Sequence, residues 1–259
     1  MTFQAADGAE LSYTELGPRG DIPLLFVHGW NGAAAVWEPI VARLAKRHRT
    51  IVIDVRGFGA SRAAPGPYRV ETFSDDLSAL LVAADLDPLV VVGHSMGAAV
   101  AQRFAIDRPD AVEGLVLIAP VPASGIAFPP KADALFRTLT GDPVATNTWL
   151  SQLTHRELPS EAARIVRAAA ATARPDVALE SYESWSRLNF ADEAATIATP
   201  TLVIAPESDR PMNPAAVRER VADLIDGSRF EILREAGHYA PLEQPERIAG
   251  LIERFVDEL

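Results

Sequence analysis

The sequence predicts an α/β protein with a mostly parallel sheet and helices on both of its faces. Short, nearly continuous runs of Leu, Ile and Val alternate with longer amphipathic segments, and such runs are typical of strands buried on both faces. Alternating strands and helices form right-handed crossovers, which cover both sides of a sheet. A third observation is one long stretch between two strands that is helical in pattern throughout.

The elements follow in order along the chain. The segments 2–5 and 10–16, separated by Asp7-Gly8, read as an antiparallel hairpin at one edge of the sheet. Buried strands are expected at 24–27, 51–55, 89–92, 115–119, 201–205 and 230–233, and helices at 35–47, 72–84, 96–107, 214–224 and 244–259. In the last helix Ile248, Ile252 and Phe255 recur at helical spacing on one face.

Residues 121–198 contain no apolar strand run and are rich in Ala, with prolines at 129, 130, 143, 159 and 175. An insertion of this length is too long for a plain connection between strands. We interpret it as a helical cap over the carboxyl edge of the sheet, where open α/β sheets bind ligands. Residues 1–120 and 199–259 would then form the core domain. The alternative is a helical subdomain that serves packing alone.

Composition limits the partners. The chain has 259 residues, a net charge of -11 and no Cys. The acidic balance argues against nucleic acid and against an anionic membrane surface, and the missing Cys excludes thiolate metal sites and a Cys nucleophile. The first residues have no signal-peptide pattern, and the apolar stretch 114–130 is interrupted by four prolines, so we expect a cytoplasmic protein without a membrane span.

The segment from Gly93 to Gly97 reads G-H-S-M-G and lies between a buried strand and a helix. This is the context of a nucleophile elbow, in which a sharp turn presents Ser95 above the sheet. Flanking glycines allow the strand and the helix to approach closely. The alternative is a glycine-rich turn in which Ser95 only caps the helix.

A serine nucleophile needs a base, and the base needs an acid that orients it. His238 lies in a loop after the last strand, on the same edge as Ser95, and is the predicted base. Asp209 follows the strand 201–205 and is the predicted acid, with Glu207 as the fallback. The other histidines are assigned elsewhere: His94 to packing, His48 to a solvated helix end and His155 to the surface, although a ligand contact of His155 stays open.

The backbone N–H of Met96, next to the nucleophile at a helix N-terminus, is one expected donor to an oxyanion. The second is the N–H of Trp30 in the loop His28-Gly29-Trp30, and the Trp30 side chain would form a wall of the acyl pocket. The alternative for Trp30 is a core aromatic. The loop from Asp54 to Ser61 lacks a phosphate-binding motif and is expected to be structural, held by an ion pair of Asp54 or Arg56. No metal-binding motif or cofactor motif occurs, so we predict no metal and no cofactor.

Together these pieces resemble the α/β-hydrolase fold superfamily. The matching segments are His28-Gly29-Trp30, the glycine-rich loop at 54–59, the elbow at Ser95, Asp209 and Gly237-His238. The resemblance implies an eight-stranded sheet, a triad of Ser95, Asp209 and His238, and a helical cap between the sixth and seventh strands. Haloalkane dehalogenases and epoxide hydrolases of this fold carry Asp at the elbow, so Ser95 argues against both.

The expected function is hydrolysis of a small-molecule carboxylic ester or lactone through an acyl-enzyme. Two alternatives keep the same triad, namely a C–C bond hydrolase and a cofactor-free haloperoxidase or perhydrolase. A third alternative is a non-catalytic receptor for a small molecule. Four aromatic residues of the insertion are candidates either for pocket walls or for cap core: Phe128, Phe136, Trp149 and Trp185.

Overall fold

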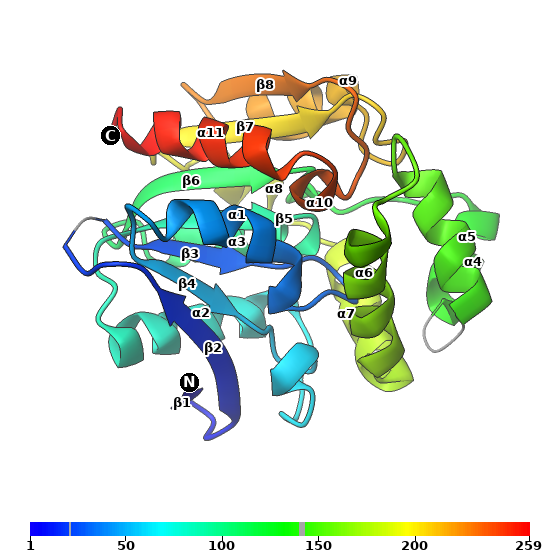
Figure 1. Cartoon of the computed structure of the whole chain (residues 1–259), viewed down its shortest axis with the longest axis horizontal. Coiled ribbons are helices and arrows are strands. Elements are labelled where there is room, and N and C mark those ends of the chain that lie inside the picture. Colours follow the sequence, from blue (N-terminus) through cyan, green and yellow to red (C-terminus); the bar gives the residue numbers. More distant parts are fainter. Residues whose placement is uncertain (21, 140–142) are drawn as a thin grey trace.

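The computed structural model describes residues 1–20, 22–139 and 143–259. Within them the strands form a single eight-stranded sheet in the order β1-β2-β4-β3-β5-β6-β7-β8 (Figure 1). Only the pairings of β2 with β1 and with β4 are antiparallel, which confirms the mostly parallel sheet and the edge hairpin. The strands are β1 (Thr2–Gln4), β2 (Glu10–Leu16), β3 (Leu24–Val27), β4 (Thr50–Ile53), β5 (Leu89–His94), β6 (Val112–Ile118), β7 (Thr201–Pro206) and β8 (Arg229–Leu233).

Side-chain alternation in the buried strands divides the core between the two faces of the sheet. In β3, Leu24 and Phe26 join one hydrophobic cluster while Leu25 and Val27 join another. The first cluster packs under α1 (Glu38–Leu44) and α11 (Pro245–Val256), and the second packs under α2 (Val70–Ala84) and α3 (Met96–Asp107). Helices therefore cover both faces, as predicted (Figure 1).

Five described helices lie between β6 and β7: α4 (Pro130–Thr138), α5 (Pro143–Leu153), α6 (Ser160–Thr172), α7 (Pro175–Ser186) and α8 (Ala191–Ala194). The prolines that interrupt the sequence mark helix starts, because the first helical position needs no amide hydrogen. Figure 1 shows α4 to α7 beyond the carboxyl ends of the parallel strands. The predicted insertion also includes residues 140–142, which lie outside the described residues.

Two predicted helices differ from the structure. The segment 35–47 begins as a 3₁₀ turn (Ala34–Trp37) and becomes α-helical only at Glu38, because Pro39 has no amide hydrogen to donate to Ala35. The segment 214–224 divides into the short helix α9 (Pro214–Val217) and a π-helical turn (Arg218–Ala222). One more short helix, α10 (Ala240–Glu243), precedes α11.

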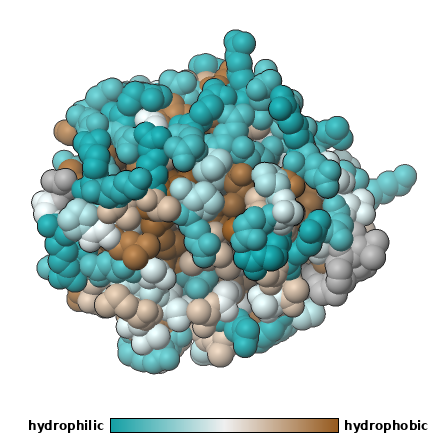
Figure 2. All heavy atoms as spheres, viewed as in Figure 1, coloured by the Kyte–Doolittle hydropathy of each residue, from teal (hydrophilic) through white to brown (hydrophobic). Residues whose placement is uncertain are grey.

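The outer surface is mainly hydrophilic. Hydrophilic residues cover most of the face seen in Figure 2, and hydrophobic residues are visible mainly between them. None of the helices in the described segments has the length and apolar character needed to cross a membrane.

Candidate active site

The turn between β5 and α3 holds Ser95 in an uncommon backbone conformation, with φ of 57° and ψ of -119°. A Cβ atom on Gly93 would lie 2.4 Å from the carbonyl oxygen of Gly97, and one on Gly97 would lie 2.3 Å from that of Val27. Both contacts are too short for any side chain, so glycine is required at both positions. The predicted elbow is therefore present as a geometric feature.

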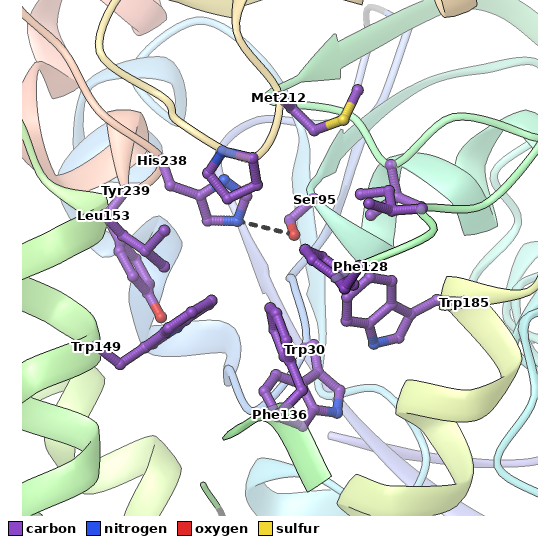
Figure 3. A pocket seen from close by; sticks show the side chains of 13 residues that line it. Trp30, Ser95, Phe128, Phe136, Trp149, Leu153, Trp185, Met212, His238 and Tyr239 are labelled. Atoms are coloured by element: carbon purple, nitrogen blue, oxygen red, sulfur yellow. Dashed lines mark hydrogen bonds between the residues drawn. The ribbon is translucent and has the colours of Figure 1, made fainter. Parts of the chain in front are cut away.

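The structure brings Ser95, His238 and Asp209 into one hydrogen-bonded chain. The Oγ atom of Ser95 lies 3.0 Å from Nε2 of His238 (Figure 3). On the other side of the ring, Nδ1 of His238 lies 2.7 Å from Oδ2 of Asp209. Ser95 follows β5, Asp209 follows β7 and His238 follows β8, so the carboxyl edge of the sheet gathers all three. The fallback acid, Glu207, is exposed and accepts the amide of Glu235 instead.

Burial and charge act in opposite directions on His238. Burial lowers the pKa of its imidazole, whereas the charge of Asp209, the hydrogen bond to that carboxylate and the charge of Glu243 raise it. The net effect is a pKa above the ordinary value of 6.5. Because the carboxylate can only accept, Nδ1 carries the proton and the lone pair on Nε2 faces the Ser95 hydroxyl.

The remaining histidines have distinct surroundings. The ring of His94 is buried, and its Nε2 donates to the carbonyl oxygen of His238 at 2.7 Å. Burial lowers the pKa of His94 to about 3, so the ring is neutral and supports the His238 loop. His155 is exposed, as predicted. The prediction for His48 was wrong: its side chain is buried, because it lies four positions after Leu44, on the same core-facing side of the chain.

Two backbone amides lie close to Ser95 along the chain or through the Gly29 loop. The amide of Met96 is the first in α3, where no intrahelical acceptor exists. The amide of Trp30 makes no backbone hydrogen bond within the described part of the chain. A Cβ atom on Gly29 would lie 3.0 Å from Cβ of Ser95, which shows how closely this loop approaches the elbow. The role of both amides in binding an oxyanion stays a prediction.

The loop after β4 is structural, as the sequence indicated. The guanidinium of Arg56 is buried and contacts carboxylate oxygens of Asp76 at 2.6 Å and of Asp7 at 2.7 Å. Asp54 accepts the amide of Ala34 at 2.8 Å. Across the described ranges no group of three or more His, Asp or Glu residues is arranged to hold a metal ion.

A junction between α5 and the His238 loop was not predicted. The carbonyl oxygen of Leu153 accepts the amide of His238 at 2.7 Å. One carboxylate oxygen of Glu243 accepts the amides of Gly237 at 3.0 Å and His155 at 2.8 Å. These contacts join segments far apart in the sequence, and no local motif marks Glu243. The end of α5 is thereby fixed to the loop that carries His238.

Ser95 and His238 lie at a small cavity that opens to solvent (Figure 3). Its lining is mainly aromatic and aliphatic and comprises Trp30, Ser95, Val121, Ile126, Phe128, Phe136, Trp149, Leu153, Trp185, Pro211, Met212, His238 and Tyr239. All four aromatic candidates from the insertion line it, and the indole N–H of Trp30 is anchored to the carbonyl oxygen of Ala178 at 2.9 Å. No sequence pattern pointed to the other lining residues, which are the aliphatic Val121, Ile126 and Leu153, together with Pro211, Met212 and Tyr239.

Two solved structures share this architecture. An esterase from Exiguobacterium antarcticum has a TM-score of 0.90 at 21% identity, and the match covers 99% of both chains. A thermophilic esterase from Thermogutta terrifontis, with malate bound, has a TM-score of 0.85 at 25% identity, covering 100% of this chain and 98% of the other. Because the first structure is only 21% identical, its similarity to this chain shows the fold alone.

Sequence comparison identifies the family. A relative from Mycobacterium tuberculosis, named "Putative non-heme bromoperoxidase BpoC", is 30% identical over 95% of this chain and 97% of its own. The family model described as "alpha/beta hydrolase fold" matches residues 22–245, which is most of the chain. The chain therefore belongs to the α/β-hydrolase fold family and is a hydrolase enzyme.

Proposed function

We propose that the protein is a serine hydrolase that cleaves a carboxylic ester or lactone of a small molecule through an acyl-enzyme. The observation that carries the proposal is the hydrogen-bonded chain from Ser95 through His238 to Asp209, with distances of 3.0 and 2.7 Å, beside an apolar cavity. A hydroxyl, an imidazole and a buried carboxylate in this order are suited to nucleophilic attack on a carbonyl.

In the proposed reaction, Ser95 Oγ attacks the carbonyl carbon while Nε2 of His238 accepts the hydroxyl proton. The imidazolium that forms is stabilised by Asp209, which is fully buried beside it. The amides of Met96 and Trp30 would donate to the oxyanion of the tetrahedral intermediate. His238 then returns the proton to the leaving alkoxide, and a water molecule activated by the same imidazole releases the acid.

The proposal includes a cap formed by residues 121–198 over a core of residues 1–120 and 199–259. Seven of the cavity residues come from this insertion: Val121, Ile126, Phe128, Phe136, Trp149, Leu153 and Trp185. A cap that supplies so much of the wall would exclude water from the acyl-enzyme and select the substrate. The contacts of Leu153 and His155 with the His238 loop support this arrangement.

The test is Ser95→Ala. We expect kcat for a chromogenic short-chain ester to fall by about 10⁶, as for other serine triads. A fluorophosphonate probe should label the wild type and not the variant, and the circular dichroism spectra of the two should agree. Near-normal turnover by the variant would contradict the nucleophile assignment.

A second candidate is perhydrolysis, and the name of the mycobacterial relative favours it. In that reaction the acyl-enzyme is attacked by hydrogen peroxide instead of water, which yields a peracid; the peracid then oxidises halide in solution. Incubation with acetate, peroxide and bromide, followed by bromination of monochlorodimedone, measures this activity. Bromination that is absent in Ser95→Ala would support it, whereas none above background in the wild type would exclude it.

A further inference from the structure

Building on the proposed function, we propose that the site selects neutral esters whose acyl group is an aromatic ring or a hydrocarbon chain, and rejects esters that carry a carboxylate on that group. The described cavity lining contains no Lys, Arg, Asp or Glu side chain. Its polar groups are the hydroxyls of Ser95 and Tyr239, the imidazole of His238 and indole N–H groups. The described lining therefore has no Lys or Arg that could pair with a carboxylate on the acyl group.

An aromatic cluster forms one wall. The ring of Phe136 lies 4.5 Å from those of Phe128 and Trp149, measured between centroids, and stacks on Tyr182 at 5.0 Å with an angle of 7°. Trp30 adds a ring at 5.6 Å. These rings are held in place by one another, so the wall is already formed before a ligand arrives. Their faces and edges suit a second ring or a hydrocarbon chain.

The charges behind this wall already have partners. Arg137 contacts Asp133 at 2.8 Å and Glu183 at 2.7 Å, and the Tyr182 hydroxyl donates to Asp133 at 2.7 Å. The guanidinium of Arg137 therefore pairs with Asp133 and Glu183 behind the wall and does not line the cavity.

The one formal charge that the triad contributes is negative. Asp209 is buried, and its partner His238 is neutral in the form that activates Ser95. A carboxylate bound in the cavity would lose its water without gaining a cation, and it would be repelled by Asp209. Both effects act against an anionic acyl group, whereas a methyl group at the same place gains apolar contacts.

A matched pair of substrates tests the inference on the wild-type enzyme. 4-Nitrophenyl hexanoate and mono-4-nitrophenyl adipate have the same leaving group and the same methylene chain, and differ in a terminal methyl against a carboxylate. We expect kcat/KM for the adipate to be at least about 100-fold lower, since a buried charge without a partner is costly. 4-Nitrophenyl phenylacetate should be turned over at least as efficiently as the hexanoate.

A substitution supplies the converse test. Phe128→Arg places a cation on the wall, and we expect the adipate-to-hexanoate ratio of kcat/KM to rise by at least about tenfold. The matched control is Ala127→Arg, because Ala127 is exposed and does not line the cavity, and its ratio should equal that of the wild type. If thermal denaturation shows that Phe128→Arg is unfolded, Ile126→Lys adds a cation to the same cavity and is measured instead.

The outcomes separate the two proposals. Equal kcat/KM values for hexanoate and adipate in an active wild-type enzyme would overturn the selectivity and leave the esterase intact. A ratio that stays constant in a folded Phe128→Arg or Ile126→Lys variant would also overturn it. No turnover of any of the three esters, together with no fluorophosphonate labelling of Ser95, would overturn the proposed function and this inference with it.

Discussion

Gly237 lies where the loop of His238 meets the end of α5. A Cβ atom at this position would lie 2.2 Å from the carbonyl oxygen of Leu153 and 2.7 Å from the amide nitrogen of His155. Both are backbone atoms, so no side chain can rotate away to make room. Gly237→Ala must therefore separate the loop from α5 by roughly 1 Å, the difference between these contacts and ordinary van der Waals distances.

The same displacement acts on the triad. The adjacent amide of His238 donates to Leu153 at 2.7 Å, and its imidazole must stay within hydrogen-bonding distance of Ser95. A misplacement of about 1 Å at a reacting group costs roughly 10²-fold in rate. We expect kcat for a neutral 4-nitrophenyl ester to fall by about that factor in Gly237→Ala, with about 1–3 kcal/mol lost from the free energy of unfolding.

Gly250→Ala is the matched control. Gly250 lies within α11, and a Cβ atom there would meet only the flexible end of Arg254 at 3.6 Å. Alanine is the better helix former by about 1 kcal/mol, so this variant should be as active as the wild type and slightly more stable in urea denaturation. Wild-type kcat in Gly237→Ala would refute the inference that the junction with α5 positions His238.

Other predictions concern charge. The acid limb of kcat/KM should have its inflection above pH 6.5, because only the deprotonated imidazole of His238 accepts the Ser95 proton and Asp209 raises its pKa. Asp209→Asn should move that inflection to lower pH and reduce kcat by about 10⁴-fold. Glu243→Gln keeps an oxygen acceptor but removes a charge, so the inflection should move down while kcat changes less; an unmoved inflection would contradict the role of that charge. Arg56→Ala leaves two carboxylates without their cation and should cost about 3–5 kcal/mol in urea denaturation. An exposed pair such as that of Arg47 should cost below about 1 kcal/mol, and equal losses would refute the comparison.

Much of the site follows from sequence because parallel strands all end at one edge. Once the runs at β5, β7 and β8 are recognised as strands, the residues just after them must meet. Ser95, Asp209 and His238 occupy such positions, and the glycines beside Ser95 show that backbone approaches closely there. The apolar runs and the hairpin at 2–16 account for all eight strands, including β1, and the family resemblance implied the same number.

What the sequence did not show depends on contacts between distant segments. Glu243 is the last residue of the short helix α10, and no sequence motif marks it; its contacts arise only where the end of α5 meets the loop at Gly237. The burial of His48 is not apparent from its neighbours, because Lys46, Arg47 and Arg49 beside it are all basic. For Phe136, a pattern of apolar residues cannot distinguish a cavity wall from a packed core, and the structure shows that this ring serves as both.

The positions of these contacts relate substrate selection to catalysis. The final turn of α5 supplies Leu153 both as a cavity side chain and, through its carbonyl oxygen, as the acceptor for the His238 amide. A substrate that displaced this turn would therefore also displace the base. A ligand that fits the aromatic cavity without displacing its walls leaves the hydrogen-bond distance of 3.0 Å between His238 and Ser95 unchanged. A poorly fitting ester should accordingly lose kcat as well as affinity, because the hydrogen bond of Leu153 with His238 and the contacts of Glu243 with Gly237 and His155 connect the cavity wall to the loop that holds the imidazole.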